Sequence, residues 1–267
     1  MLWNAKNGRV KFPDTGMEYV RFGRGERVFV MLPGLGDGLR SMKGMALPMA
    51  AMYRIFAEEF TVYIFSRKSR LPEGYTTRDM ARDLMLAMKA LKIKKADLFG
   101  VSMGGMIAQH FAADYPELVG KLILTVTASR PNPVLTESVT EWMEQARRGD
   151  HTALMDSNLR RIYSDAYYRH NKWLVPILGK VTKPKSYERF LIQAQACMTH
   201  DAHDRLHKIQ AETLVIGGEQ DKTLGGDPSR EIAARIPGAK LKMYPQWGHG
   251  LYEEAKDFNQ LVWEFLQ

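Results

Sequence analysis

The chain has 267 residues, of which 45% are hydrophobic and 25% charged. This is ordinary globular usage, and it excludes a disordered, collagen-like or coiled-coil protein. The single cysteine, Cys197, excludes an internal disulfide and is typical of a reducing compartment. The first residues lack the apolar stretch of a signal peptide, so we expect a cytoplasmic protein. The most apolar stretch, residues 45–57, is too short to span a bilayer, so we expect no membrane span.

The net charge is +8, which raises the question of a nucleic-acid partner. The basic residues are spread along the chain and interleaved with acidic ones, and no aromatic-rich stripe accompanies the tightest cluster, Arg67, Lys68 and Arg70. We therefore predict a solvated basic surface and no nucleic-acid partner. At most, the charge would favour an anionic substrate or acyl carrier.

Short apolar runs alternate with helical periods, which is typical of a parallel sheet covered by helices on both faces. The expected strands are residues 28–32, 60–65, 96–101, 122–126, 213–216 and 240–244. The expected helices lie near residues 80–91, 103–116 and 258–265.

Residues 131–208 break this alternation, because they show amphipathic helical periods and no convincing strand. We predict an α/β core made of residues 1–130 and 209–267, with residues 131–208 inserted as a helical cap. Aromatic and thioether side chains of this insertion are candidates for an apolar substrate pocket, or simply for core between helices: Trp142, Met143, Tyr163, Tyr167 and Trp173.

The strongest motif is Gly100-Val101-Ser102-Met103-Gly104-Gly105, which follows an expected strand and opens a helix. In a G-x-S-x-G turn the chain reverses tightly, and small neighbours are needed where backbones nearly touch. Such a turn presents the serine hydroxyl at the carboxyl end of the sheet. Ser102 is therefore the predicted nucleophile.

A serine hydroxyl needs a base, and the base needs an orienting acid. Of seven histidines, His249 lies in the loop between the last strand and the last helix, at the same edge of the sheet as Ser102. Asp221 follows the strand at 213–216 and is the predicted acid, with Asp227 in reserve.

The glycine-rich loop Pro33-Gly34-Leu35-Gly36-Asp37-Gly38 follows the first strand. We predict that the backbone N–H groups of Leu35 and Met103 form an oxyanion hole. A dinucleotide-binding loop is the weaker alternative, because the third glycine and the ribose-binding acid are missing.

His203 and His207 are spaced i, i+4, as two metal ligands on a helix can be. The glutamate that directly follows the first histidine in the H-E-x-x-H motif is absent there. We therefore predict a solvated helix end, no metal site and no cofactor.

With these segments in order, the chain resembles the α/β-hydrolase superfamily, in its capped lipase- and esterase-like branch. The matching segments are G-V-S-M-G-G, G-G-E-Q-D and W-G-H-G. Two segments depart from the superfamily pattern: Pro33 replaces a frequent histidine, and Ser66 to Leu71 replaces a D-x-R-G-x-G-x-S loop that usually braces the active site.

The resemblance implies a serine hydrolase that cleaves a small carboxylic ester, with an apolar or aromatic acyl group, through an acyl-enzyme. A carbon–carbon bond hydrolase, a lactonase or a thioesterase would use the same three residues. A non-catalytic ligand-binding protein on the same fold is an alternative of a different class. Acyl preference, physiological substrate and oligomeric state stay open at this point.

Overall fold

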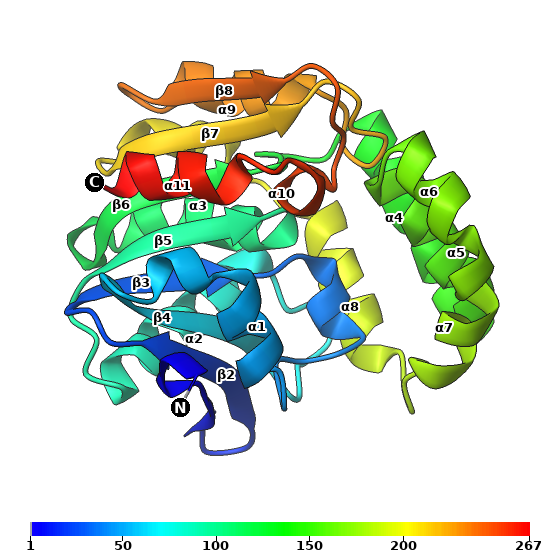
Figure 1. The fold of residues 1–267 in the computed structure, drawn as a ribbon, viewed down its shortest axis with the longest axis horizontal. Helices are drawn as coiled ribbons and strands as arrows, with labels where there is room; N and C mark the ends of the chain where they lie inside the picture. The colour runs from blue at the N-terminus through cyan, green and yellow to red at the C-terminus, as the bar shows by residue number, and fades with distance from the viewer. Residues whose placement is uncertain (1) are drawn as a thin grey trace.

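The computed structural model describes residues 2–267, and its centre is an eight-stranded sheet in the order β1-β2-β4-β3-β5-β6-β7-β8 (Figure 1). Strands β3 to β8 run parallel, whereas β2 pairs antiparallel with both β1 and β4. The strands are β1 (Lys6–Lys11), β2 (Gly16–Gly23), β3 (Arg27–Leu32), β4 (Phe60–Lys68), β5 (Ala96–Val101), β6 (Val119–Thr125), β7 (Glu212–Gly218) and β8 (Lys240–Tyr244). The predicted fold class, a mostly parallel sheet of the α/β-hydrolase type, is confirmed.

All six expected strands are present, and their ends differ from the expectation by three residues at most. The N-terminal hairpin of β1 and β2 was not predicted. In β1 only Val10 is buried, and four of the six residues are exposed, so the strand lacks the apolar run that marks its neighbours. Its position at the edge of the sheet explains this polarity, because an edge strand faces solvent.

Helices cover both faces of the sheet (Figure 1). On one face α2 (Thr77–Ala90), α3 (Met103–Asp114) and α9 (Asp227–Arg235) pack on one apolar core, and on the other α1 (Ala46–Met52) and α11 (Phe258–Leu266) pack on a second. The two cores are separated because successive side chains of a strand point to opposite faces. Residues of β3 show this, since Val30 belongs to one core and Phe29 to the other. The short elements are α10 (Leu251–Glu254), η1 (Leu2–Asn4), η2 (Leu35–Gly38), η3 (Arg54–Phe56) and η4 (Pro116–Leu118).

Between β6 and β7 the chain leaves the sheet and forms a layer of helices at its carboxyl edge (Figure 1). We call α4 to α8 the inserted helices. They are α4 (Pro133–Arg147), α5 (His151–Ile162), α6 (Asp165–Asn171), α7 (Val175–Val181) and α8 (Glu188–Met198), with η5 (Lys172–Leu174) and η6 (His203–Lys208). The division into core and cap at residues 131 and 208 stays a prediction.

None of the helices in residues 2–267 is long and apolar enough to cross a bilayer. The one cysteine of the chain, Cys197, lies buried on α8. Burial raises the pKa of its thiol to about 12, so the thiol stays protonated and unreactive near neutral pH.

Candidate active site

Ser102 occupies the turn between β5 and α3, in a backbone conformation with φ of 54° and ψ of −120°. A non-glycine residue with positive φ is strained, and here the surroundings hold it in place. The Ser102 N–H donates to the Thr125 carbonyl at 2.9 Å, and its own carbonyl accepts from the Thr127 hydroxyl at 2.7 Å. The end of β6 and the loop after it therefore fix both the N–H and the carbonyl of Ser102.

The glycines of this turn are required by close approach. A Cβ on Gly104 would lie 2.0 Å from the Leu32 carbonyl oxygen, and one on Gly105 would lie 2.6 Å from the Thr127 Cβ. A Cβ on Gly100 would lie 2.5 Å from the Gly104 carbonyl oxygen. Small residues at these positions let α3 begin directly against the sheet, which is the context the motif predicted.

Asp221 and His249 come together in the structure. His249 Nδ1 lies 2.8 Å from Asp221 Oδ2, and both side chains are buried. Asp221 Oδ1 accepts hydrogen bonds from the backbone N–H groups of Thr223 and Leu224, at 2.8 and 2.9 Å. The carboxylate is therefore fixed at both oxygens and can hold the imidazole in one orientation.

The loops that carry this pair dock on each other through their backbones. The Gln220 N–H donates to the Trp247 carbonyl at 3.1 Å, and a Cβ on Gly218 would lie 2.4 Å from that same oxygen. A Cβ on Gly248 would lie 2.7 Å from the Gln220 carbonyl oxygen. The glycines of G-G-E-Q-D and W-G-H-G thus allow the approach that brings acid and histidine together.

Ser102 and His249 line the same cavity, of about 290 Å³. Among the described residues, Ser102 Oγ forms no hydrogen bond to the histidine ring. Such bonds often close only when substrate binds.

The predicted oxyanion donors flank the serine. Met103 is the first residue of α3 and Leu35 the first of η2, so their N–H groups have no partner within their own helices. The two loops are close, since a Cβ on Gly34 would lie 3.4 Å from Ser102 Cβ.

The next helix after this loop, α1, begins only at Ala46. The helix N-terminus that a dinucleotide-binding loop needs directly after its glycines is therefore missing.

A buried ion cluster holds the Leu35 loop, and sequence reasoning missed it. The Asp37 carboxylate accepts a hydrogen bond from the backbone N–H of Arg67 at 3.0 Å and another from the guanidinium of Arg189 on α8. The guanidinium of Arg67 donates to the Pro33 carbonyl. Burial lowers the pKa of Arg67, and the Asp37 charge opposes that shift. This cluster supplies the support that the departures at Pro33 and at 66–71 put in question.

The segment at 66–71 is tied to α2. Lys68 Nζ lies 2.6 Å from an oxygen of the Asp83 carboxylate, and the Tyr75 hydroxyl donates to the other oxygen of that group at 2.8 Å. Arg189 also donates to the carbonyl of Lys68 at 3.0 Å. The segment at 66–71, which is the end of β4 and the bend after it, is thus braced although its composition differs from the superfamily pattern.

The cavity is mainly apolar. Its walls come from the ends of strands, from α1 and the loop before it, and from the inserted helices. Thioether, aliphatic and aromatic side chains line it: Met31, Leu32, Met42, Met49, Met52, Tyr53, Ile64, Phe99, Val101, Trp142, Ile162 and Tyr252. Arg40, Asn158 and Glu253 add polar groups. The wall from Met42 to Tyr53 was missed, although methionine-rich composition near an apolar stretch was a usable signal.

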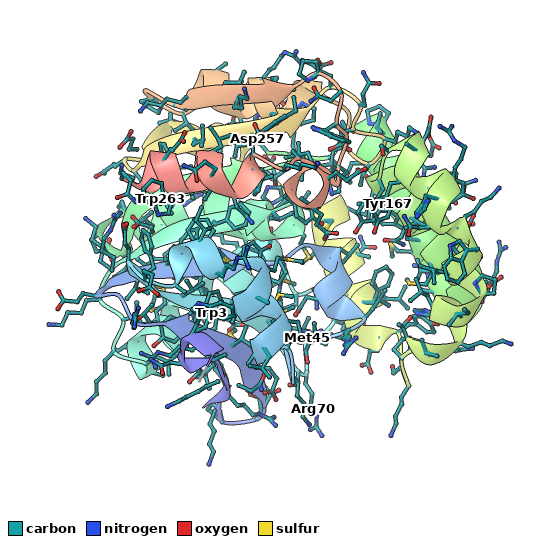
Figure 2. All side chains as sticks on the ribbon, in the orientation of Figure 1. Trp3, Met45, Arg70, Tyr167, Asp257 and Trp263 are labelled. Atoms are coloured by element: carbon teal, nitrogen blue, oxygen red, sulfur yellow. The ribbon has the colours of Figure 1, made fainter. Side chains whose placement is uncertain are left out.

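Of the pocket residues predicted from the inserted helices, only Trp142 lines this cavity. Met143, the next residue on α4, is buried in the core instead of lining the cavity, because adjacent positions of a helix point about 100° apart. Tyr167, labelled in Figure 2, stacks on Tyr163 with ring centres 4.3 Å apart. Trp173 is exposed on η5. The prediction that places Met143, Tyr163, Tyr167 and Trp173 at the substrate is therefore corrected.

The other singled-out residues lie away from the serine. Asp227 is fully exposed at the start of α9, so it does not replace Asp221. His203 lies on a 3-10 helix beside Ser129 and Glu231 rather than on an α-helix with His207. Throughout residues 2–267, no group of three or more His, Cys, Asp or Glu side chains is placed to hold a metal ion.

Comparison with known proteins agrees with this fold. The family model described as alpha/beta hydrolase fold matches residues 27–256. A 2-hydroxy-6-oxo-6-phenylhexa-2,4-dienoate hydrolase of Burkholderia cepacia is 29% identical, over 91% of this chain and 88% of its own length.

Two solved structures are similar over nearly the whole chain. An alpha/beta hydrolase enzyme from a Medee basin deep-sea metagenome library, MGS-M2, is 25% identical with a TM-score of 0.85, covering 97% of each chain. The enol-lactonase from Burkholderia xenovorans LB400 is 23% identical with a TM-score of 0.81, covering 97% of this chain and 99% of its own. With its strand–serine–helix turn, its buried Asp–His pair and the family match over most of its length, this chain belongs to the alpha/beta hydrolase fold family.

Proposed function

We propose that this chain is a serine hydrolase that cleaves a carboxylic ester with an apolar acyl group. The observation that carries the proposal is the buried Asp221–His249 pair, hydrogen-bonded at 2.8 Å, at a cavity that Ser102 also lines. Ligand binding alone would not require a serine held in a strained turn beside an oriented histidine. This weighs against a non-catalytic binding protein.

In the first half of the reaction, His249 takes the proton of the Ser102 hydroxyl while Oγ bonds to the substrate carbonyl carbon. The carbonyl electron pair moves to oxygen, and the N–H groups of Leu35 and Met103 stabilise the resulting oxyanion. Losing one such donor typically costs about 3 kcal/mol of transition-state stabilisation. Asp221 stays ionised and stabilises the imidazolium.

In the second half, the bond from the carbonyl carbon to the alcohol oxygen breaks, and His249 gives its proton to the leaving alcohol. A water then repeats the sequence, losing a proton to His249 and releasing the acyl group as an acid. Ser102 regains its proton. None of these steps needs a metal or an organic cofactor.

We also propose that residues 131–208 act as a cap over this site. Support comes from Trp142, Asn158 and Ile162 of the inserted helices, which line the cavity opposite the strand ends. Their contacts reach the catalytic loops directly: the Gly250 N–H donates to the Ile162 carbonyl at 2.6 Å, and the Ser164 hydroxyl donates to Glu254 at 2.6 Å.

A second candidate is hydrolysis of a carbon–carbon bond in a keto-enol acid. It is favoured by the Burkholderia cepacia relative, whose name describes a dienoate substrate. Arg40, an exposed side chain at the same cavity, offers a cation for such a carboxylate. The same three residues would serve, because the nucleophile again attacks a carbonyl carbon.

The test is labelling with a fluorophosphonate followed by mass mapping, together with turnover of p-nitrophenyl esters. We expect an adduct on Ser102, and we expect Ser102→Ala to lower kcat by at least about 1,000-fold with thermal stability near that of the parent. Folded protein without an adduct, or retained turnover in Ser102→Ala, would overturn the proposal. Comparing kcat/KM on short p-nitrophenyl esters, a lactone and a 2-hydroxy-6-oxo-dienoate separates the two candidates.

A further inference from the structure

One stretch of the inserted helices and of the loop after α7 is strongly basic. From Ala166 to Tyr187 the chain has five Lys and Arg residues and no Asp or Glu: Arg169, Lys172, Lys180, Lys183 and Lys185. All five side chains are exposed. This stretch, which we call the α6–α7 segment, therefore carries a charge of +5 in 22 residues.

Large apolar side chains stand exposed among these cations. Trp173, Ile177 and Val181 are 65%, 50% and 72% exposed. They are spaced by four residues along the continuous helical stretch of η5 and α7, so they follow one side of it. Neighbouring apolar side chains exposed to this degree on one helix side mark an interaction surface rather than the scattered exposure of ordinary proteins.

The opposite side of the same stretch is its anchor. Val175 is buried, and Gly179 packs so closely on α5 that a Cβ there would lie 2.9 Å from the Thr152 Cα. The helix therefore has a packed side and a free side. Figures 1 and 2 show α5, α6 and α7 on the flank away from the sheet, with side chains extending outward.

We propose that the free side of the α6–α7 segment docks on an anionic lipid bilayer. Trp, Ile and Val would enter the headgroup boundary, where Trp is favoured, and the lysines and arginine would lie among anionic headgroups. The chemistry is that of a peripheral amphipathic helix: an apolar strip with cations beside it and no acidic residue within the segment itself. Asp150 and Asp156 lie next to Lys172 and Trp173 at one end of this surface, so the lysines beyond α7 carry most of the attraction.

Two other occupants fit less well. A second copy of this chain would bring a +5 surface against an identical one, and the repulsion opposes pairing. An acidic protein would form ion pairs with the lysines and the arginine, but this would not account for the three exposed apolar side chains. A fluid bilayer accommodates protruding apolar groups together with a delocalised negative charge.

The active-site cavity faces the other side of the same helical layer, through Trp142, Asn158 and Ile162. Docking would thus hold the protein at a membrane by its inserted helices without contacting Ser102. The proposal is independent of the reaction catalysed.

The test is co-sedimentation of the full chain with vesicles of phosphatidylcholine alone and of phosphatidylcholine with phosphatidylglycerol. We expect binding to the anionic vesicles only, weakened at high salt because the charges are exposed. The apolar variant W173S/I177S/V181S and the charge variant K180E/K183E should each bind at least about tenfold more weakly than the parent.

Matched variants control for composition and net charge. Leu241→Ser removes an exposed apolar side chain from β8, and K94E/K95E reverses two exposed lysines at the start of β5. Both should bind like the parent, and thermal unfolding of every variant checks that it is folded.

Three outcomes overturn the proposal. One is a parent protein that does not bind anionic vesicles. Another is a loss of binding that is equal in K180E/K183E and K94E/K95E. The third is evidence that assigns the surface to a protein partner. Such evidence is a concentration-dependent dimer that W173S/I177S/V181S abolishes, or binding to polyglutamate without binding to vesicles.

Discussion

The nucleophile turn and the oxyanion loop lie side by side at the cavity, but they are held in different ways. Ser102 is fixed by the Thr125 carbonyl at the end of β6, by the Thr127 hydroxyl just after it, and by glycines that admit no side chain. The loop at Leu35 is fixed by side chains, namely the buried charges of Asp37, Arg67 and Arg189. One of these charges, Arg189, belongs to the inserted helices.

This difference separates two requirements of the proposed reaction. The nucleophile depends on the sheet and on the loop that follows β6, so changes in the inserted helices should leave it in place. The oxyanion donor at Leu35 depends on α8, so the same changes should reach the stabilisation of charge in the transition state. Mutations can test each half of this contrast.

The largest expected effect follows from Asp37→Asn, which leaves the Arg67 guanidinium buried without its counter-charge. Breaking a buried ion pair on one side typically lowers the free energy of unfolding by about 3–5 kcal/mol. Chemical denaturation measures this loss, and kcat should fall more than KM rises because the loop loses its fixed position.

Glu58→Gln is the matched control for that change, since it breaks the exposed pair with Arg24 on the protein surface. There the loss should stay within about 1 kcal/mol. Similar losses in both variants would show that the cluster at Asp37 has no special role.

The next effect contrasts two glycines. Gly104→Ala would place a methyl group 2.0 Å from the Leu32 carbonyl, whereas around Gly36 no atom of the described residues lies within 4 Å of a built Cβ. We expect Gly104→Ala to lose about 3 kcal/mol of unfolding free energy and Gly36→Ala to stay within about 1 kcal/mol. Thermal unfolding of both variants decides the matter, and a tolerated Gly104→Ala would mean that the turn is not held by close approach.

The smallest effect concerns pH, and it arises on α3, the helix that Ser102 opens. Burial, aided by Arg205, lowers the pKa of His110 to about 4, against about 6.5 for an ordinary histidine. The fold therefore favours the neutral ring. This contribution is complete above pH 6.5 and is lost as the pH falls towards 4, by about 2 kcal/mol between pH 7 and 5.

His110→Gln should flatten that decline when unfolding is measured at both pH values. Burial beside His110 also lowers the pKa of His200, in the same direction, so part of the decline should remain. An identical pH dependence in the parent and in His110→Gln would refute the assignment.

The positions of the three segments that we propose to be catalytic could be predicted because each is encoded locally. A strand, a turn rich in small residues and a helix follow one another within about ten residues around Ser102, and the loops at Asp221 and His249 each follow a strand directly. Local pattern and chain order are sufficient to bring such segments to one edge of a parallel sheet.

The brace and the pocket were beyond prediction for physical reasons. Asp37, Arg67 and Arg189 are up to 152 residues apart, and nothing in their neighbourhoods indicates that they meet. For the pocket, Trp142 faces the cavity while Met143 does not, because the docking angle of α4 selects the face. Such angles come from tertiary packing rather than from periodicity.

The buried thiol of Cys197 makes the protein a convenient carrier of a single probe. Since its own thiol stays protonated and inaccessible, a cysteine introduced at Ile177 or Leu241 would be the sole reactive site on the folded chain. A polarity-sensitive dye attached there would report, residue by residue, which part of the surface leaves water, without first removing a native group from the core.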